Sequence, residues 1–468
     1  MPPLMRAREP QAMTLPERTA TIATECDVLV VGGGPAGLGA ALGAAWTGAD
    51  VVLVERYGFL GGNATAALVM PLMSFHTQDG GPATRRAADL MPADHGRGEP
   101  VVQGALEHFL GRLVADGGAI PPSEQTGFVV PFDPETFKQV ALDVLDAARV
   151  RYLFHALASG VLGSPRVDGV IFETKSGPIV IRARATVDCT GDGDVAALAG
   201  APFEVGRDAD GMVQPMTLMF RMVEFERVAF AAYRQAHPGQ WRGVHGLWDL
   251  IAQATAAGEL TLPREDILFF GTPHAREVSV NSTRVTGVLG TSVWDLTRAE
   301  WQARRQMRQL GAFLRKYVPG FDRSYVVQSG VTIGVRETRR ITGEYRLTAD
   351  DILGARKWDD VIARGTYPLD IHNPQGKGTL LMRLPPGEAY DIPLRCLVPQ
   401  RLDRLTVAGR CISGTHEAHS SYRVMPIAMA TGQAAGVCAA LAARAGKAVR
   451  DVPVGDVQGE LRRQGAAL

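Results

Sequence analysis

A glycine-rich turn near the start of the chain has the spacing that lets a backbone approach the phosphates of a dinucleotide. Residues 32–37 read GGGPAG, between an apolar run at 28–31 and a stretch of small residues of helical character. In such a G-x-G-x-x-G turn, Gly32 permits the tight bend, Gly34 lets the backbone approach a pyrophosphate, and Gly37 lets helix and strand pack closely. The free N–H groups and dipole of the helix start favour a bound phosphate. The pattern therefore predicts a strand, turn and helix that bind a dinucleotide.

An acidic residue follows where such a site would bind ribose. Glu55 comes 23 residues after Gly32, at the end of a second strand predicted over 50–54. Its carboxylate can accept hydrogen bonds from ribose hydroxyls and would repel a 2′-phosphate. Gly62 and the residues around it, GGNAT, would let the chain fold back across an elongated dinucleotide. NAD dehydrogenases do not generally need this second contact, so the segment favours FAD over NAD. Taken alone, the glycine pair is also consistent with an ordinary turn.

The rest of the chain predicts the elements that hold this turn in place. Asp133 followed by Pro134 is typical of a helix start, because the acid caps free N–H groups and proline suits the first helical position. Strand-like runs at 151–162, 167–174 and 178–187 predict a small antiparallel meander. An amphipathic helix is expected over 299–317.

Two later segments could return the chain to the same edge of the sheet. An apolar run ends in TGDGD at 190–194, and the run at 404–411 ends in a glycine turn at Gly409. The stretch that starts at Met425 has an early proline and closely spaced Ala and Gly, which predicts a helix packed tightly on a sheet. The Asp and Gly of TGDGD are also found in calcium loops, but the EF-hand spacing and closing Glu are missing, so no metal is predicted.

Composition excludes several classes of protein. The 468 residues carry 49 basic and 49 acidic side chains, which gives no electrostatic footprint for nucleic acid or an anionic membrane. The five cysteines form no Cys-x-x-Cys pair, so neither a zinc ribbon nor an iron–sulfur ligand run is predicted. We expect no membrane-spanning stretch of about 18 apolar residues. A cytoplasmic protein is the resulting expectation.

Several segments together resemble a known family. They are VVGGGPAGLGAALGAAWTGADVVLVER, FLGGNAT, VDCTGDGDVAALAG, GVRETRRITGEYRLTADDI, YPLDIHNP, YDIPLRCLVP and LTVAGRCISGTHEAHSSYRVMPIAMATGQAAG, within residues 25–445. The chain is similar to the glutathione-reductase-type FAD-dependent oxidoreductases. Within them it resembles the bacterial FAD-dependent oxidoreductases, some of which are described as xanthan-lyase-like. Relatives with iron–sulfur clusters carry cysteine runs that this sequence lacks, so we expect FAD and no iron.

The resemblance implies where FAD would be held. Glu55 would bind the adenosine ribose, Arg56 would lie beside the adenine, and Val161 would contact the adenine through its backbone. Gly62 and Asn63 would lie near the flavin. The remaining residues would contact the rest of the cofactor. Those along the pyrophosphate are Gly32, Gly34, Pro35, Ala36 and Gly37, and those at the phosphate and ribityl are Gly191, Asp192, Gly409 and Arg410. Met425 begins the helix that would face the flavin.

A flavin enzyme must also orient its substrate and manage one proton. His416 and His419 lie in GTHEAHSSYR, between Arg410 and the helix expected to face the flavin, and histidine suits acid–base work near neutral pH. Arg423 could fix a carboxylate or oxyanion. His372 in LDIHNP and Arg336 in GVRETRR are further candidates. Each has a structural alternative, such as a hydrogen bond to a backbone carbonyl or an ion pair.

The sequence thus predicts an α/β fold with a Rossmann-type FAD-binding domain (parallel sheet and β-meander) and an inserted α+β substrate domain. The favoured function is hydride transfer between a small polar organic substrate and flavin N5. Alternatives are a C=C reductase of an unsaturated carboxylate, an electron-transfer or assembly flavoprotein without its own substrate, and a plain NAD dehydrogenase. Covalent flavin attachment and a homo-oligomer stay open. The expected divisions are a tail at 1–22, FAD-binding parts at 23–75, 131–205 and 401–450, an insertion at 76–130, a substrate domain at 206–400 and a C-terminal tail at 451–468.

Overall fold

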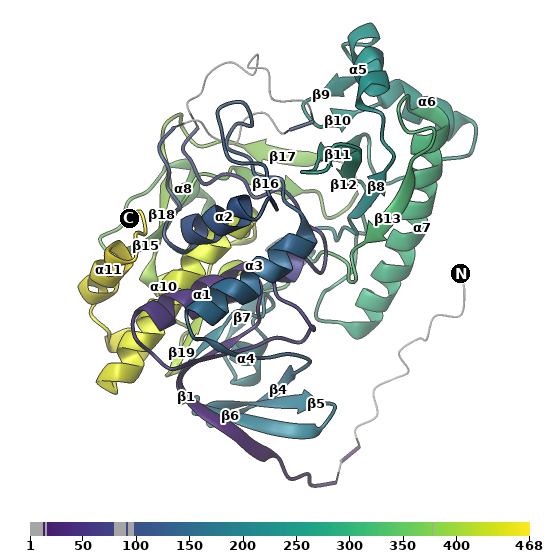
Figure 1. The fold of residues 1–468 in the computed structure, drawn as a ribbon. Coiled ribbons are helices and arrows are strands. Elements are labelled where there is room, and N and C mark those ends of the chain that lie inside the picture. Colours follow the sequence, from purple (N-terminus) through teal and green to yellow (C-terminus); the bar gives the residue numbers. More distant parts are fainter. Residues whose placement is uncertain (1–12, 15, 79–89, 92–97, 377) are drawn as a thin grey trace.

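The computed structural model describes residues 13–14, 16–78, 90–91, 98–376 and 378–468 (Figure 1). Most of the predicted N-terminal tail, at 1–12 and 15, and much of the predicted loop, at 79–89 and 92–97, therefore lie outside the described residues. The described chain forms an α/β fold with a seven-stranded mixed sheet and a six-stranded antiparallel sheet, each with its own hydrophobic core, and three two-stranded antiparallel sheets.

The first sheet has seven strands in the order β3-β2-β1-β6-β5-β4, and β19 pairs with the end of β6. The pairs β1–β2, β2–β3, β1–β6 and β6–β19 are parallel, which places their carboxyl ends at one edge. Their apolar residues are buried on both faces, as expected for a covered parallel sheet. The bounds are β1 Thr21–Val31, β2 Val51–Val54, β3 Arg151–Leu153, β4 Leu157–Leu162, β5 Gly169–Thr174, β6 Gly177–Asp188 and β19 Leu405–Val407.

The predicted meander is confirmed in β4, β5 and β6, which pair antiparallel. The strand β6 has two roles. Its first half, Gly177–Arg182, pairs with β5, and its last residues, Thr186–Asp188, pair with β19. The meander and the parallel part are therefore joined by one continuous strand.

Two helices from opposite ends of the chain pack against each other over this sheet (Figure 1). They are α1 (Pro35–Trp46) and α10 (Met425–Ala445). A Cβ on Gly432 would lie 2.0 Å from the carbonyl oxygen of Ala36, and a Cβ on Gly436 would lie 2.0 Å from that of Ala40. Glycine at these positions lets the two helix backbones touch.

The helix α10 corrects one expectation. By length and composition it could cross a membrane, although 83% of its most apolar window is buried inside the protein. No stretch of about 18 uncharged apolar residues was expected, but the first charged residue after Met425 is Arg444. Its burial against α1 and the sheet accounts for the apolar composition.

The second sheet has the order β13-β8-β12-β11-β10-β9 and carries an aromatic core. Phe225, Phe230, Phe269 and Phe321 are fully buried there and contact one another. Its strands are β8 Phe220–Val223, β9 Trp241–Arg242, β10 His245–Gly246, β11 Ile267–Gly271, β12 Glu277–Val280 and β13 Tyr325–Ser329. The helices around it are α5 Arg227–Ala236, α6 Trp248–Ala256 and α7 Val293–Tyr317. The predicted amphipathic helix is α7, which begins earlier than expected, at an N-cap formed by Ser292.

The remaining elements cover the first sheet and connect the two cores. Asp133 caps α3 as predicted, because its carboxylate accepts hydrogen bonds from the N–H groups of Glu135 and Thr136. Arg221 of β8 reaches across to the same Asp133, at 3.1 Å, and to Glu277 of β12, at 2.8 Å. The other helices are α2 Ala105–Ala115, α3 Pro134–Ala147, α4 Asp194–Leu198, α8 Ala349–Leu353, α9 His416–Tyr422 and α11 Val454–Arg463. The other strands are β7 Phe203–Val205, β14 Arg339–Ile341, β15 Val361–Gly365, β16 Leu369–His372, β17 Thr379–Met382 and β18 Tyr390–Pro393.

Candidate cofactor and active site

A cavity of about 510 Å³ opens where the parallel strands of the first sheet end. Residues directly after β1, β2, β6 and β19 line it, together with the start of α10. Ligands of open α/β sheets bind at this edge. The expected cofactor residues that line it are Gly32, Gly34, Pro35, Ala36, Glu55, Arg56, Gly62, Asn63, Gly191, Asp192, Gly409, Arg410 and Met425.

The glycine turn is packed so closely that side chains are excluded. Gly32 has φ +101°, and a Cβ there would lie 2.4 Å from the carbonyl oxygen of Cys189. A Cβ on Gly37 would lie 1.8 Å from the carbonyl oxygen of Gly32, so Gly37 supports the turn from below and does not line the cavity. Gly34 begins α1 without a side-chain cap, and a Cβ on Gly62 would lie 2.8 Å from its Cα. The free N–H groups of α1 therefore lie at a part of the cavity wall that is formed by backbone.

Glu55 lies at the end of β2 and has a second role that its position in the sequence does not suggest. Its Oε2 accepts a hydrogen bond of 2.6 Å from the Gly33 N–H, and its Oε1 accepts one of 2.9 Å from the Tyr57 N–H. Burial raises the pKa of this carboxyl group above its usual range, against those hydrogen bonds. Glu55 thus holds the glycine turn in place as well as lining the cavity.

The far side of the cavity differs from the expectation at Val161. The lining residues there are Ala156, Leu157 and Ala158, at the start of β4. Val161 lies farther along β4, where it pairs with Val170 of β5, and is not among the lining residues. The chain approaches the cavity at the bend before β4 and moves away along the strand.

A buried ion pair between Asp192 and Arg410 lines another part of the cofactor cavity. Asp192 accepts hydrogen bonds from Arg410 Nη2, at 2.9 Å, and from Thr338 Oγ1, at 2.8 Å. The other terminal nitrogen of Arg410, Nη1, is buried and has no partner within the described part of the chain. A buried donor normally has an acceptor. This guanidinium is therefore aimed at an acceptor that a ligand would supply.

A smaller cavity of about 140 Å³ adjoins the first and shares Asn63, Arg410, Arg423 and Met425 with it. We call it the side cavity. Three of the expected catalytic residues, Arg336, His372 and Arg423, line it, together with Tyr367, Asp370 and Asn281, which the sequence reasoning missed. The pair Asp-x-His in LDIH was the available signal for Asp370.

Asp370 is the central acceptor of the side cavity. Its Oδ2 lies 2.9 Å from the Tyr367 hydroxyl, 3.3 Å from Arg423 Nη2 and 3.3 Å from His372 Nε2. Burial would raise the pKa of Asp370, but the charges and hydrogen bonds of these neighbours hold it far below its usual range. Asp370 is therefore ionised.

His372 is neutral, with one tautomer selected by its neighbours. Its Nδ1 lies 3.2 Å from Arg284 Nη2, which can only donate, so Nδ1 accepts and Nε2 carries the proton toward Asp370. Burial, reinforced by the nearby Arg336, lowers the pKa of His372 to about 4 although Asp370 acts in the opposite direction.

The two histidines favoured from the sequence lie elsewhere. His416 is buried in α9, where its Nδ1 lies 3.0 Å from Glu337 Oε1, and Glu337 is paired with Arg340. His419 is also buried, and burial lowers its pKa well below the usual value. Neither lines the cofactor cavity or the side cavity. The structure thus places them away from these cavities because α9 turns its first residues toward Glu337 and Arg340.

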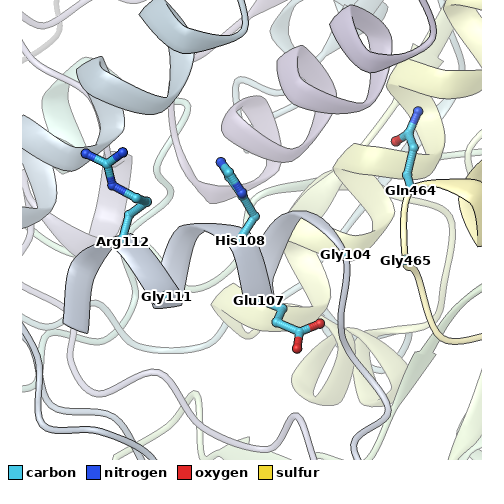
Figure 2. A pocket seen from close by; sticks show the side chains of 7 residues that line it. All are labelled: Gly104, Glu107, His108, Gly111, Arg112, Gln464 and Gly465. Carbon is cyan, nitrogen blue, oxygen red and sulfur yellow. The ribbon is translucent and has the colours of Figure 1, made fainter. Parts of the chain in front are cut away.

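A third hollow is open to solvent and is lined by residues of α2 and by the two residues that follow α11 (Figure 2). His108 and Arg112 point to one side of α2 in this view, and Glu107 points to the other. The hollow shares no lining residue with the other two cavities. Its side chains do not converge on a common point, so it is not the candidate active site.

Comparison with known proteins identifies the family. The model of the family described as FAD dependent oxidoreductase matches residues 27–461. The chain belongs to this family. It is an FAD-dependent oxidoreductase, and its cofactor is FAD. The glycine turn, the open start of α1 and the unpartnered Arg410 Nη1 fit a large anionic dinucleotide.

Solved structures with a similar fold are distant. A geranylgeranyl bacteriochlorophyll reductase-like protein from Thermoplasma acidophilum is 12% identical, with a TM-score of 0.44 over 94% of this chain and 83% of that chain. The p-nitrophenol 4-monooxygenase of Pseudomonas putida DLL-E4 is 12% identical, with a TM-score of 0.47 over 95% of this chain and 87% of that chain. Curated protein sequences give no match.

Proposed function

We propose that this FAD-dependent oxidoreductase transfers hydride between flavin N5 and a small polar organic molecule bound in the side cavity. The supporting observation is that the side cavity adjoins the cofactor cavity and shares Asn63, Arg410 and Arg423 with it. Bound FAD supplies the group that accepts or donates hydride. At about 140 Å³ the side cavity suits a small substrate, because sites for drug-sized ligands begin near 300 Å³.

The chain's own residues divide the remaining tasks. The glycine turn and Glu55 hold the cofactor, and Arg336 and Arg423 orient the substrate. We assign the acid–base role to His372 in place of His416 and His419. A proton released by the substrate would be taken at His372 Nδ1, the acceptor nitrogen, in exchange for its contact with Arg284. The imidazolium that forms would face Asp370 through Nε2, 3.3 Å away, and the carboxylate would stabilise it.

Anaerobic screening tests this function directly. Candidate metabolites are mixed with the holoenzyme, and bleaching of the flavin absorbance identifies a substrate. With that substrate, His372→Gln should slow flavin reduction by about 10²- to 10⁴-fold, the usual contribution of general acid–base catalysis. The matched control is His237→Gln, at an exposed histidine after α5. An unchanged reduction rate in H372Q with full FAD content would remove the proton role.

A second candidate is a reductase of a C=C bond in an unsaturated carboxylate. It is favoured by the two arginines, Arg336 and Arg423, that line the side cavity. Anaerobic titration of the reduced protein with unsaturated acids separates the two reactions. The alternative of an electron-transfer protein without a substrate predicted no ordered polar cavity next to the cofactor, and the side cavity is evidence against it.

The finer assignments stay predictions. They are the glutathione-reductase-type grouping with xanthan-lyase-like relatives, the small-molecule partner and the division of the chain into FAD-binding and substrate parts. The division is supported by the return of β19 and α10 to the first sheet and by the separate aromatic core of the second sheet. Limited proteolysis of the holoenzyme tests the boundaries.

A further inference from the structure

The charges of the side cavity do not balance. Arg423 is paired with Asp370 at 3.3 Å, and Arg410 is paired with Asp192 at 2.9 Å. Arg336 differs from these two, because its hydrogen-bond partners among the described residues are neutral. Its Nη1 donates to the Pro215 carbonyl at 2.7 Å and to Thr217 Oγ1 at 2.6 Å. Three guanidinium groups that line the side cavity therefore share two carboxylates, Asp370 and Asp192, and His372 is neutral, so one positive charge is in excess.

This charge lies in an environment that does not favour it. Burial and the neighbouring charge of Arg423 lower the pKa of Arg336 to about 9 although Asp370 acts in the opposite direction, so the side chain is still protonated at neutral pH. A buried charge is costly unless it is paired. An anion in the side cavity would offset the energetic cost of burying the Arg336 charge. It would also reduce the electrostatic repulsion between Arg336 and Arg423.

Unsatisfied hydrogen-bond donors point to the same kind of ligand. Arg423 Nε and Arg410 Nη1 are buried and lack an acceptor within the described residues. A guanidinium can only donate, so the missing partner must bring acceptor oxygens. Arg410 and Arg423 line both cavities, and FAD could satisfy them. Arg336 lines the side cavity but not the cofactor cavity. An anion bound at Arg336 would therefore belong to the substrate and not to FAD.

Part of the lining of the side cavity, which we call the methionine wall, is apolar. Met70, Met73, Met219 and Phe270 form it. Methionine side chains adapt to the shape of an apolar group. The cavity therefore combines an unpaired cation with a small apolar wall, within about 140 Å³.

We propose that the substrate is a small organic acid whose carboxylate binds Arg336 and whose apolar part packs against the methionine wall. This assignment rests on the proposed function, since it names the substrate class of the same site. A carboxylate presents two acceptor oxygens in the planar geometry that a guanidinium matches with two parallel hydrogen bonds. A neutral polar substrate would leave the Arg336 charge unbalanced.

The experiment measures binding to the FAD holoenzyme by calorimetry. The probes are benzoate and butanoate, each compared with its uncharged amide. Both acids should bind at least 10-fold more tightly than their amides. Arg336→Gln should weaken acid binding by about 10- to 100-fold, as expected for loss of charge-assisted hydrogen bonds, and leave amide binding unchanged. Arg336→Lys keeps the charge but not the two-pronged geometry and should fall between R336Q and the unsubstituted protein.

The control variant is Arg308→Gln, an exposed arginine of α7, and each variant is checked for FAD content and thermal unfolding. Equal binding of acids and amides, or acid binding that R336Q does not weaken in a fully loaded protein, would overturn the carboxylate assignment. If a neutral compound then bleaches the flavin, hydride transfer stands and the substrate class falls. If acids bind through Arg336 but no acid is oxidised or reduced, the site stands and the proposed function falls.

Discussion

The contact between α1 and α10 offers a stringent test, because it joins the two ends of the chain at the cofactor cavity. A Cβ on Gly432 would lie 2.0 Å from the Ala36 carbonyl oxygen, while real Cβ contacts under 3.0 Å are essentially never found. Gly432→Ala must therefore separate the helix backbones by about 1 Å. Gly436→Ala makes the same demand one turn farther from the cavity, at the Ala40 carbonyl oxygen.

The energetic cost follows from the packing. Overpacking a core costs about 1–3 kcal/mol, and here the upper end applies because the clashing atoms belong to two helix backbones. A gap of about 1 Å also removes up to half of the dispersion energy of the neighbouring contacts. At about 2.1 cal/mol/K of unfolding entropy per residue, 3 kcal/mol lowers Tm by about 3 °C. Gly432→Ala should also weaken FAD binding, because Ala36 and Met425 line the cavity at this contact.

Thermal unfolding followed by flavin fluorescence, together with calorimetric titration of the apoprotein with FAD, measures both effects. The matched control is Gly459→Ala in α11, where an added Cβ would meet nothing within 4 Å. Alanine there should raise stability by about 0.5–1 kcal/mol, because glycine inside a helix is unfavourable. If G432A and G436A melt with the unsubstituted protein and bind FAD normally, the proposed contact between the helices is wrong.

Three further outcomes are expected. Glu55→Gln should weaken FAD binding by about 10- to 100-fold in calorimetry, since it removes a charged acceptor that also holds the Gly33 N–H; unchanged affinity would contradict the role of Glu55. Arg221→Met should cost about 3 kcal/mol of unfolding free energy in urea, because the buried Glu277 carboxylate loses its guanidinium partner while Asp133 keeps His274 and the N–H groups of α3; a loss under 1 kcal/mol would argue against that network. The His372 imidazole should titrate near pH 4 in NMR spectra, not near 6.5. Since folding lowers this pKa, its stabilising contribution is complete above about pH 6.5 and is lost as the pH falls toward 4.

Local signals explain what the sequence could predict. The glycine turn, Glu55 and the Asp133 N-cap each depend on residues close together in the chain, and the structure has each of them in the expected element. The return of the chain at Gly409 and Met425 was also predictable, because small residues near a strand end or a helix start indicate close packing. These features define the edge of the first sheet.

Long-range packing explains what the sequence could not predict. His416 and His419 lie between Gly409 and Met425, which both line the cavity, so their place in the chain suggested the same location. The direction of α9 depends on Glu337, 79 residues earlier in the chain, and no local pattern shows that contact. The approach of His372 to the cavity likewise depends on the tertiary arrangement.

The pairing of α1 with α10 has a consequence for synthesis on the ribosome. Gly432 lies 396 residues after Ala36, so the first glycine turn emerges long before the helix that covers it. At 5–20 residues per second, the delay is about 20–80 s. During that time the face of α1 that α10 covers has no permanent cover, and the nascent chain should depend on chaperones until α10 is translated.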